Sequence, residues 1–310
     1  VLRHRIGTGG MGEVWKAERR SSGGHVQSVA VKFLTDAGSS DTSLDQEALR
    51  MSLLSHDNIV PFVDSGRDEA GRYFVAMAFV EGMDLDGLRR LVGLDGPAIY
   101  AGEVGDAVRV PEQLVGFVLF MTLRALDYAH TFDFGDGAIG LVHRDISPGN
   151  ILLDERRGFV KLSDFGVAVA AQGDDENTGQ IAGKVPYMAP EVLVGDPADA
   201  RSDLYALGLV AYELATGLNP NVRPAVLKSV IGTVTEVMLA VEKPLVPPHE
   251  VVEGPTPAFF EIVLRMLARD PAERLQTAAE ALDAVSVLLF EKGYGPTTNS
   301  LVKYFEILRD

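Results

Sequence analysis

Three glycines near the start of the chain have a spacing that can bind phosphate groups. Gly7, Gly9 and Gly12 form the pattern Gly-x-Gly-x-x-Gly. The same pattern marks dinucleotide-binding folds, where the glycines open a helix and an acidic residue follows about 20 positions later. Here residues 13–17 (Glu-Val-Trp-Lys-Ala) continue as a strand. We therefore expect a strand, a glycine turn and a second strand that cover phosphates, with a glycine-rich hairpin that binds nothing as the alternative.

Oxygen-bearing side chains that could hold a metal ion lie in the middle of the chain. Asp145 follows His143 and Arg144, Asn150 comes five residues later, and Asp164 begins the triplet Asp-Phe-Gly. Hard oxygen ligands suit Mg²⁺, and phosphoryl transfer needs positioning and charge neutralisation more than covalent chemistry. Each acid taken alone is equally compatible with a solvated loop carboxylate, so the case depends on the ordered set.

The ordered set resembles the protein kinase family. The resemblance rests on residues 143–150 (His-Arg-Asp-Ile-Ser-Pro-Gly-Asn), 164–166 (Asp-Phe-Gly) and 189–191 (Ala-Pro-Glu), and it extends over residues 1–290 or so. It implies that Asp145 accepts or orients the proton of the attacking hydroxyl group. It also implies that Asn150 and Asp164 hold the Mg²⁺ ions that neutralise the phosphates.

The same resemblance assigns the residues around ATP. Lys32 ends the alternating run Val-Ala-Val-Lys, and an ion pair with Glu47 would direct its amine to the α- and β-phosphates. Taken alone, such a lysine is usually only solvated. Met77 would control the depth of the adenine pocket, and the peptide groups of residues 78–80 would bind the adenine edge. The remaining nucleotide-binding residues are Ile6, Gly7, Gly9, Gly12, Val14, Ala30, Phe79, Val80, Leu152 and Asp164.

Other residues that the resemblance singles out would support the site rather than do chemistry. They are an apolar stack between the lobes (Met51, His143, Phe165), a buried anchor beneath the catalytic loop (Asp203) and a long-range ion pair (Glu191, Arg274).

Two positions depart from the pattern of serine/threonine kinases. That family carries a lysine two residues after the catalytic Asp, and this chain has Ser147. Where the family places a threonine before the Tyr-Met-Ala-Pro-Glu segment, this chain has Lys184. We hypothesise that Lys184 replaces the lost cation and is catalytic, because a developing trianionic group in a partly water-excluded site is costly without one. The alternative is that Lys184 faces solvent or selects substrates, and that Mg²⁺ suffices.

A regulatory site can also be predicted from the sequence. Arg144 beside Asp145 is typical of a loop that a phosphate group can order, because guanidinium binds phosphate bidentately. Thr178 is the only hydroxyl residue between the Asp-Phe-Gly triplet and Tyr187, and is therefore the candidate phosphorylation site. The acids at 174–176 could instead supply the negative charge constitutively.

The elements that position these residues predict an α+β, bilobal fold. A small β-rich lobe with one main helix would extend to about residue 80, and a larger, mainly helical lobe would follow. We expect a kinase domain over residues 1–292 and a helical C-terminal extension over 293–310. The predicted elements are strands at 28–34 and 73–80, helices at 43–55, 204–215 and 277–293, a helix behind Pro111, and irregular loops at 93–110 and 170–183. In the extension Leu301, Tyr304, Phe305 and Leu308 share a helical face, which would pack on the large lobe or bind a partner.

Composition limits the partners and the location. The formal net charge of −16 argues against non-specific binding to nucleic acid, and no stretch is apolar enough to span a membrane. The absence of cysteine excludes disulfides and thiolate chemistry. We expect a cytoplasmic kinase domain with protein substrates. The chain begins at Val1, inside a predicted strand, so we expect a piece of a longer protein, with flanking domains, dimerisation or membrane anchorage all open.

The predicted function is transfer of the γ-phosphoryl group of ATP, with Mg²⁺, to serine or threonine hydroxyls of proteins. Ser147 and Lys184 resemble a bacterial branch of the serine/threonine kinases, which points to bacterial signalling. Ser147 also leaves tyrosine specificity open. The competing hypotheses are a pseudokinase scaffold, which binds nucleotide or partners without efficient catalysis, and a kinase for small molecules.

Overall fold

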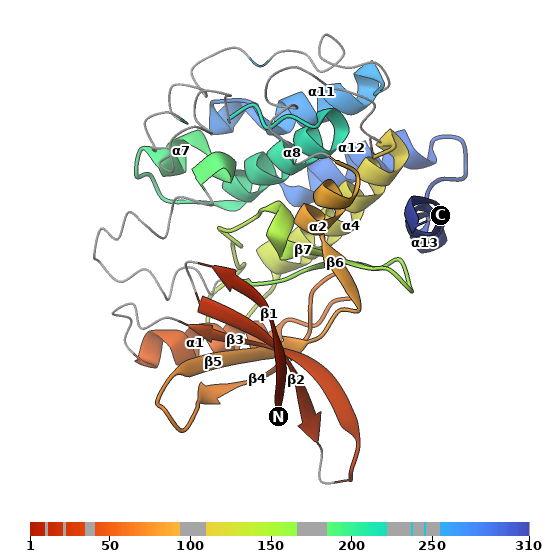
Figure 1. Cartoon of the computed structure of the whole chain (residues 1–310). Helices are drawn as coiled ribbons and strands as arrows, with labels where there is room; N and C mark the ends of the chain where they lie inside the picture. Colours follow the sequence, from red (N-terminus) through yellow and green to blue (C-terminus); the bar gives the residue numbers. More distant parts are fainter. Residues whose placement is uncertain are drawn as a thin grey trace.

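The computed structural model describes residues 1–9, 12–20, 23–34, 41–93, 110–165, 185–221, 237, 245 and 255–309. Figure 1 shows two lobes, with the strands of the first third of the chain in one and most of the helices in the other. The predicted α+β, bilobal fold is confirmed.

A twisted antiparallel sheet forms the small lobe. Its strands are β1 (Leu2–Gly9), β2 (Gly12–Arg20), β3 (Val26–Leu34), β4 (Phe62–Arg67) and β5 (Tyr73–Ala78), in the order β1-β2-β3-β5-β4. Helix α1 (Asp41–Leu53) precedes β4 and contacts it.

Alternation along β3 decides which side chains face the rest of the molecule. Val29, Val31 and Phe33 lie in a small core on one face of the sheet. Because successive side chains of a strand point to opposite faces, Ala30 and Lys32 lie on the other face. That face is the one toward the large lobe, where the cleft described below is lined by both residues.

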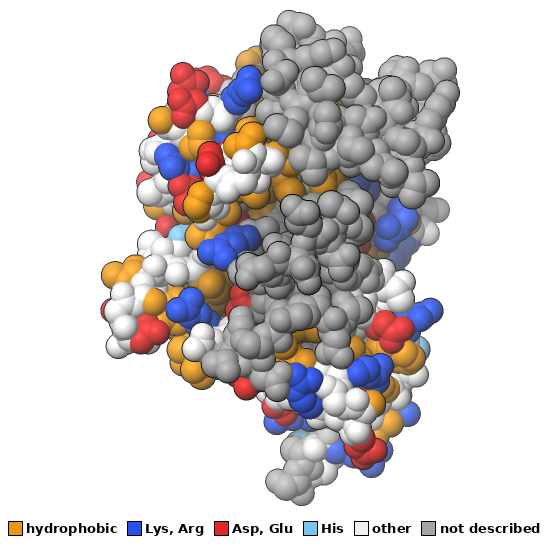
Figure 2. Space-filling view, turned by 90° about the vertical axis from the view of Figure 1, so that its left-hand side faces the viewer, with side chains coloured by type: hydrophobic (Ala, Val, Ile, Leu, Met, Phe, Trp, Pro, Cys, Tyr) orange, Lys and Arg blue, Asp and Glu red, His pale blue; other side chains and the backbone are white. Residues whose placement is uncertain are grey.

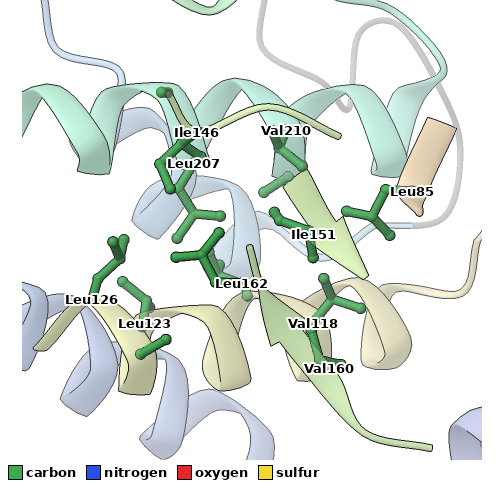
Figure 3. Packing of buried hydrophobic residues seen from close by; sticks show 14 of the residues in the cluster. Leu85, Val118, Leu123, Leu126, Ile146, Ile151, Val160, Leu162, Leu207 and Val210 are labelled. Carbon is green, nitrogen blue, oxygen red and sulfur yellow. The ribbon is translucent and has the colours of Figure 1, made fainter. Parts of the chain in front are cut away.

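The large lobe is built from helices around one main core. Its long helices are α4 (Glu112–Thr131), α8 (Ala200–Thr216), α11 (Pro257–Met266) and α12 (Ala278–Phe290); shorter elements are α2 (Leu85–Leu91), α7 (Pro190–Leu193) and the 3-10 helices η1 (Pro148–Asn150), η2 (Val185–Tyr187) and η4 (Pro271–Glu273). Nearly every residue of α8 is buried, which explains the almost wholly apolar run over residues 204–215. Figure 3 shows Leu123 and Leu126 of α4 beside Leu162, with Leu207 and Val210 of α8 on the opposite side.

A second, three-stranded sheet lies on the large-lobe side of the cleft. Strands β6 (Gly82–Asp84), β7 (Ile151–Asp154) and β8 (Val160–Leu162) pair in that order. The segment after α1 joins this sheet to the small lobe, because Val60 N donates to Leu162 O at 2.9 Å and Leu162 N donates to Asn58 O at 2.8 Å. These bonds connect the strand that precedes Asp164 to the end of α1.

The C-terminal helix α13 (Thr298–Arg309) packs on the large lobe, as one of the two predictions for it stated. Leu301, Tyr304 and Phe305 are buried in the main core, and Leu308 packs against it. Ile307 points outward and is exposed.

Several predicted boundaries were wrong by a few residues. The helix predicted at 43–55 is Asp41–Leu53. The helix predicted at 204–215 starts earlier, because Asp199 and Ser202 cap it. The helix predicted to reach Gly293 ends at Phe290. Most of the two predicted loops, residues 94–109 and 170–183, lies outside the described residues. No helix in the described ranges is both long and apolar enough to cross a membrane.

Candidate active site

A cleft of about 390 Å³ lies between the two lobes. One wall comes from β1, β2, β3 and β5 of the small lobe, and the opposite wall from α2, β6, β7, Gly149 of η1 and the segment after β8. Ten of the residues predicted to bind the nucleotide or metal line it: Ile6, Gly7, Val14, Ala30, Lys32, Met77, Phe79, Val80, Leu152 and Asp164.

Strand register brings the apolar residues of the cleft together. Ala30 of β3 lies opposite Met77 of β5, and Val14 of β2 lies opposite Lys32. Leu152, the half-buried residue of β7, faces them from the three-stranded sheet. The resulting slot is apolar on its two opposite walls, which suits a flat aromatic ring such as adenine.

Lys32 and Asp164 meet in the cleft. Lys32 Nζ lies 3.0 Å from Asp164 Oδ1, and the Lys32 side chain is only 8% exposed. Glu47 lies half-buried on α1, and its predicted ion pair with Lys32 stays a prediction. An amine and a carboxylate at this separation can hold each other in place until phosphate oxygens and a cation separate them.

The glycine turn between β1 and β2 has a backbone reason for at least one of its glycines. Gly12 has φ +135°, and a Cβ there would lie 1.7 Å from Phe33 O. Gly9 pairs with Gly12 across the turn. Gly12 is thus required by the close approach of β3, and the part of Gly9 and Gly12 in binding phosphate stays a prediction.

The catalytic loop holds Asn150 against Asp145. Asn150 Nδ2 donates to Asp145 O at 2.7 Å and to Asp145 Oδ2 at 2.8 Å, and both side chains are buried. Because the amide nitrogen is used in this way, Oδ1 of Asn150 is the atom that could bind a cation. Ser147 precedes η1 and is half-buried.

Asp203 anchors this loop from α8, as predicted. Its carboxylate accepts from His143 N at 2.7 Å, from Arg144 N at 2.8 Å and from His130 Nε2 at 2.8 Å. Asp203 is 1% exposed. Arg144 has φ +64°, a conformation unusual for a residue with a side chain, and the bond to Asp203 helps to stabilise it.

Two of the three residues of the predicted apolar stack lie side by side. The rings of His143 and Phe165 lie 4.6 Å apart, and Met51 is buried in the same core. His143 Nδ1 accepts from Asp145 N at 3.2 Å, so its proton is on Nε2, which donates to Ser163 O at 2.8 Å. The ring therefore connects the catalytic loop to the residue before Asp164.

Two ion pairs with little solvent exposure connect elements of the large lobe around the site. Arg274 binds Glu191 through two bonds of 2.7 Å, which confirms the predicted pair. The second pair was not predicted: Arg89 of α2 lies 2.6 Å from Glu213 of α8, which also accepts from Tyr187 OH at 2.6 Å. Burial raises the pKa of both Glu213 and Tyr187.

The cleft also includes residues that the sequence reasoning missed. They are Val60, Gly82, Met83, Asp84, Gly87, Arg90, Gly149 and Ser163. Asp84 is the clearest of them, because it caps α2 by accepting from Gly87 N at 2.6 Å, and burial raises its pKa. Its signal in the sequence was an Asp directly before a helical run, two residues after Gly82.

Three predicted residues lie outside the described residues. These are Lys184, the threonine Thr178 and Gly166 of the Asp-Phe-Gly triplet. Among the described residues, no three His, Cys, Asp or Glu side chains gather as a metal site. Asn150 and Asp164 could therefore hold Mg²⁺ only together with other oxygen donors, which is the usual arrangement when Mg²⁺ binds with a nucleotide.

A two-lobed fold whose cleft is lined by Lys32 and Asp164, with Asp145 and Asn150 on the loop whose Gly149 lines the same cleft, defines the kinase class of nucleotide-binding proteins. Residues 1–285 match the family described as protein kinase domain. The chain therefore belongs to the protein kinase family.

Named relatives of the chain are bacterial protein kinases. The serine/threonine-protein kinase pkn3 of Myxococcus xanthus is 34% identical over 90% of this chain and 48% of its own length. The tyrosine-protein kinase MasK of the same species is 33% identical, over 94% of this chain and 43% of its own length. PknA of Mycobacterium tuberculosis, a serine/threonine-protein kinase, is 32% identical, over 93% of this chain and 60% of its own length. The chain thus spans about half the length of these relatives.

A solved structure shows the same fold. The kinase domain of PknI from Mycobacterium tuberculosis superimposes with a TM-score of 0.58 at 23% identity. The superposition covers 92% of this chain and 94% of the PknI chain.

Proposed function

We propose that this chain is the catalytic domain of a bacterial serine/threonine kinase, which transfers the γ-phosphoryl group of ATP to hydroxyl groups of proteins. The observation that carries this proposal is the arrangement of four side chains. Lys32 and Asp164 meet in the cleft, and Asn150 holds Asp145 on the loop whose Gly149 lines the cleft. The names of the relatives support serine and threonine as acceptors, and MasK makes tyrosine a point for the test.

In the proposed reaction the protein hydroxyl oxygen forms a bond to the γ-phosphorus, and the bond to the β-γ bridging oxygen breaks. The hydroxyl proton passes to Asp145, and ADP leaves. Asp145 is suited to this because Asn150 fixes one of its oxygens, and a positioned carboxylate can accept a proton as the new bond forms. Lys32 would bind the phosphates that remain on ADP.

Mg²⁺ fits the oxygen donors of the site. Asn150 through Oδ1 and Asp164 through its carboxylate would hold it, and the bound ion would neutralise charge on the phosphates. The same two residues also hold other side chains of the site in place. Asn150 fixes Asp145, and Asp164 fixes Lys32.

Phosphate transfer from radiolabelled ATP to general protein substrates tests the proposal. Asp145→Asn should lose at least about 100-fold in turnover, since general base catalysis contributes that much or more. Asp196→Asn, an exposed Asp with the same change of charge, is the matched control. Equal label with wild type and Asp145→Asn would contradict catalysis, and a wild type that binds ATP without transfer would identify a pseudokinase. Phosphoamino-acid analysis would separate serine and threonine from tyrosine.

The second part of the proposal concerns the cation at the γ-phosphate. Ser147 stands where serine/threonine kinases carry a lysine, and we propose that Lys184 supplies the charge from the other side of the site. A cation near the transferred group stabilises the charge that develops there. Loss of the Lys184 amine should therefore lower turnover more than it weakens ATP binding.

Steady-state kinetics of Lys184→Met test this role. We expect turnover to fall by about 100-fold at saturating ATP, and Ser147→Lys to restore part of it in the double variant. Lys292→Met, at an exposed lysine, controls for the loss of one charge. An unchanged turnover number for Lys184→Met would remove Lys184 from the catalytic residues.

A further inference from the structure

Helix α13 lies beyond residues 1–285, the part of the chain that the kinase family matches. Its buried face consists of Leu301, Tyr304 and Phe305. Figure 1 shows the helix at the side of the large lobe, next to the loop that joins β7 to β8. The helix is therefore a built part of the domain and not a loose tail.

The helix touches the β7–β8 turn through its backbone. Gly158 of that turn has φ +69°, and a Cβ there would lie 1.9 Å from Thr298 O, at the first residue of α13. At the other end of the helix, Arg309 forms an ion pair with Glu155 of the same turn. Two ends of α13 thus contact two residues of one five-residue turn.

The β7–β8 turn holds residues 81–83, which connect the two lobes and are called the connector below. Glu155 N donates to Glu81 O at 3.2 Å, and Gly82 pairs with Asp154. The approach is so close that a Cβ at Gly82 would lie 1.9 Å from Leu153 O. A displaced turn must therefore displace the connector.

The connector forms one wall of the cleft. Gly82 and Met83 line it directly. Glu81 adds a second contact, because its Oε1 lies 3.3 Å from Lys16 Nζ, which lies 3.9 Å from the ring centre of Phe79, another residue of the wall. A continuous set of contacts therefore runs from α13 through the turn to the nucleotide end of the cleft.

We propose that α13 is a positioning element for the nucleotide, which fixes the β7–β8 turn and through it the connector 81–83. The inference rests on the proposed function only in that the cleft must bind a nucleotide. The contacts of the connector with ATP would be made equally in the ground state and in the transition state. Loss of the support from α13 therefore changes nucleotide affinity and KM for ATP, and leaves kcat nearly unchanged.

Two variants of the full chain loosen this support in different ways. Gly158→Ala forces the turn away from Thr298, and Phe305→Ala removes a buried ring from the face of α13. Each has a matched control. Gly71→Ala has a similar backbone angle, φ +81°, with no atom within 4 Å of the added carbon, and Ile307→Ala shortens a side chain of the same helix that is 71% exposed.

The measurements are the dissociation constant of ADP by calorimetry, and KM for ATP with kcat. We expect Gly158→Ala and Phe305→Ala to raise both the dissociation constant of ADP and KM for ATP by about fivefold or more, with kcat changed less than about twofold. A coupling of this size is common between linked sites. Because both variants act through one helix, their double variant should show less than the product of the two effects.

The proposal would be overturned if Gly158→Ala and Phe305→Ala had the same dissociation constant of ADP and the same KM for ATP as their controls. So would a fall in kcat at unchanged KM, or equal effects in all four variants. If Phe305→Ala does not fold, as its circular dichroism would show, Gly158→Ala against Gly71→Ala decides alone. ADP binding needs no phosphate transfer, so a chain that binds ADP but transfers nothing would disprove the kinase activity and still test the role of α13.

Discussion

Arg144 and Asp164 share a left-handed backbone, with φ of +64° and +62°. Such a conformation costs about 1–3 kcal/mol in a residue with a side chain and persists only where neighbouring bonds hold it. For Arg144 the bond from its N–H to Asp203 does so. Arg144 stands next to Asp145, and Asp164 itself lines the cleft, so both strained positions lie at groups that the proposed reaction uses.

The buried pair of Glu191 and Arg274 should make stability depend on pH in a defined direction. Burial alone would raise the pKa of Glu191, but hydrogen bonds from Arg274 and Ser202 outweigh it, and the pKa lies below its ordinary value of 4.5. A carboxylate with a lowered pKa contributes stability above pH 4.5, and this contribution is lost as the pH falls through the folded-state pKa.

Arg274→Gln should therefore lower the free energy of unfolding by about 3–5 kcal/mol at neutral pH, the usual effect of breaking a buried pair. The difference from wild type should shrink as the pH falls through the acidic range, because without Arg274 burial raises the pKa of Glu191, and the variant's carboxyl group takes up a proton before that of wild type. Urea denaturation across the pH range measures both. Arg265→Gln, in the exposed pair with Glu280, should cost less than about 1 kcal/mol, and a difference that grows on acidification would refute the assignment.

Individual site residues could be predicted where a short motif fixes both type and spacing. Asp145, Asn150 and Asp164 fall in this group, as do the supporting Asp203 and Arg274. Val60 reaches the same cleft from the segment after α1, and no local pattern marks it. Its place depends on how that segment pairs with β8, which is a tertiary contact.

Capping decides where the principal helix of the large lobe begins. Asp199 accepts from Arg201 N at 2.8 Å, and Ser202 Oγ accepts from Asp199 N at 3.2 Å. The predicted start at residue 204 followed the apolar run alone. Residues 200–203 are polar or small, so apolar periodicity could not include them, although Asp199 carried the capping signal.

Removal of this cap should destabilise the domain measurably. Asp199→Ala should lower the free energy of unfolding by about 1 kcal/mol, the typical effect of losing an N-cap side chain. Urea denaturation measures it, with Asp196→Ala as a control that removes an exposed carboxylate just before the helix. The helix end matters for the site because Asp203 lies in its first turn. Equal losses for Asp196→Ala and Asp199→Ala would show a charge effect and no capping effect.

At the scale of the whole molecule, one core extends across both lobes. The main cluster joins Met51, Val75 and Met77 of the small lobe to the helices of the large lobe, while the separate small core is confined to the outer face of the first sheet. The sequence predicted two lobes but not this division of the core, because burial on one face of a strand or the other depends on what packs there. Figure 2 shows Lys and Arg side chains interspersed with Asp and Glu over the described part of one face, with no continuous basic patch there.

A shared core and a shared cleft predict that the two lobes unfold together and that nucleotide stabilises both. ADP with Mg²⁺ at 100 times its dissociation constant should add about 2.7 kcal/mol to the free energy of unfolding. The cleft takes lining residues from both lobes, so one thermal transition should shift as a unit. Lys32→Met should lose most of the shift, because Lys32 is the buried cation of the cleft, whereas Lys292→Met should keep it. Two transitions, of which nucleotide moves only one, would mean that the lobes are stabilised separately and that the common core does not couple them.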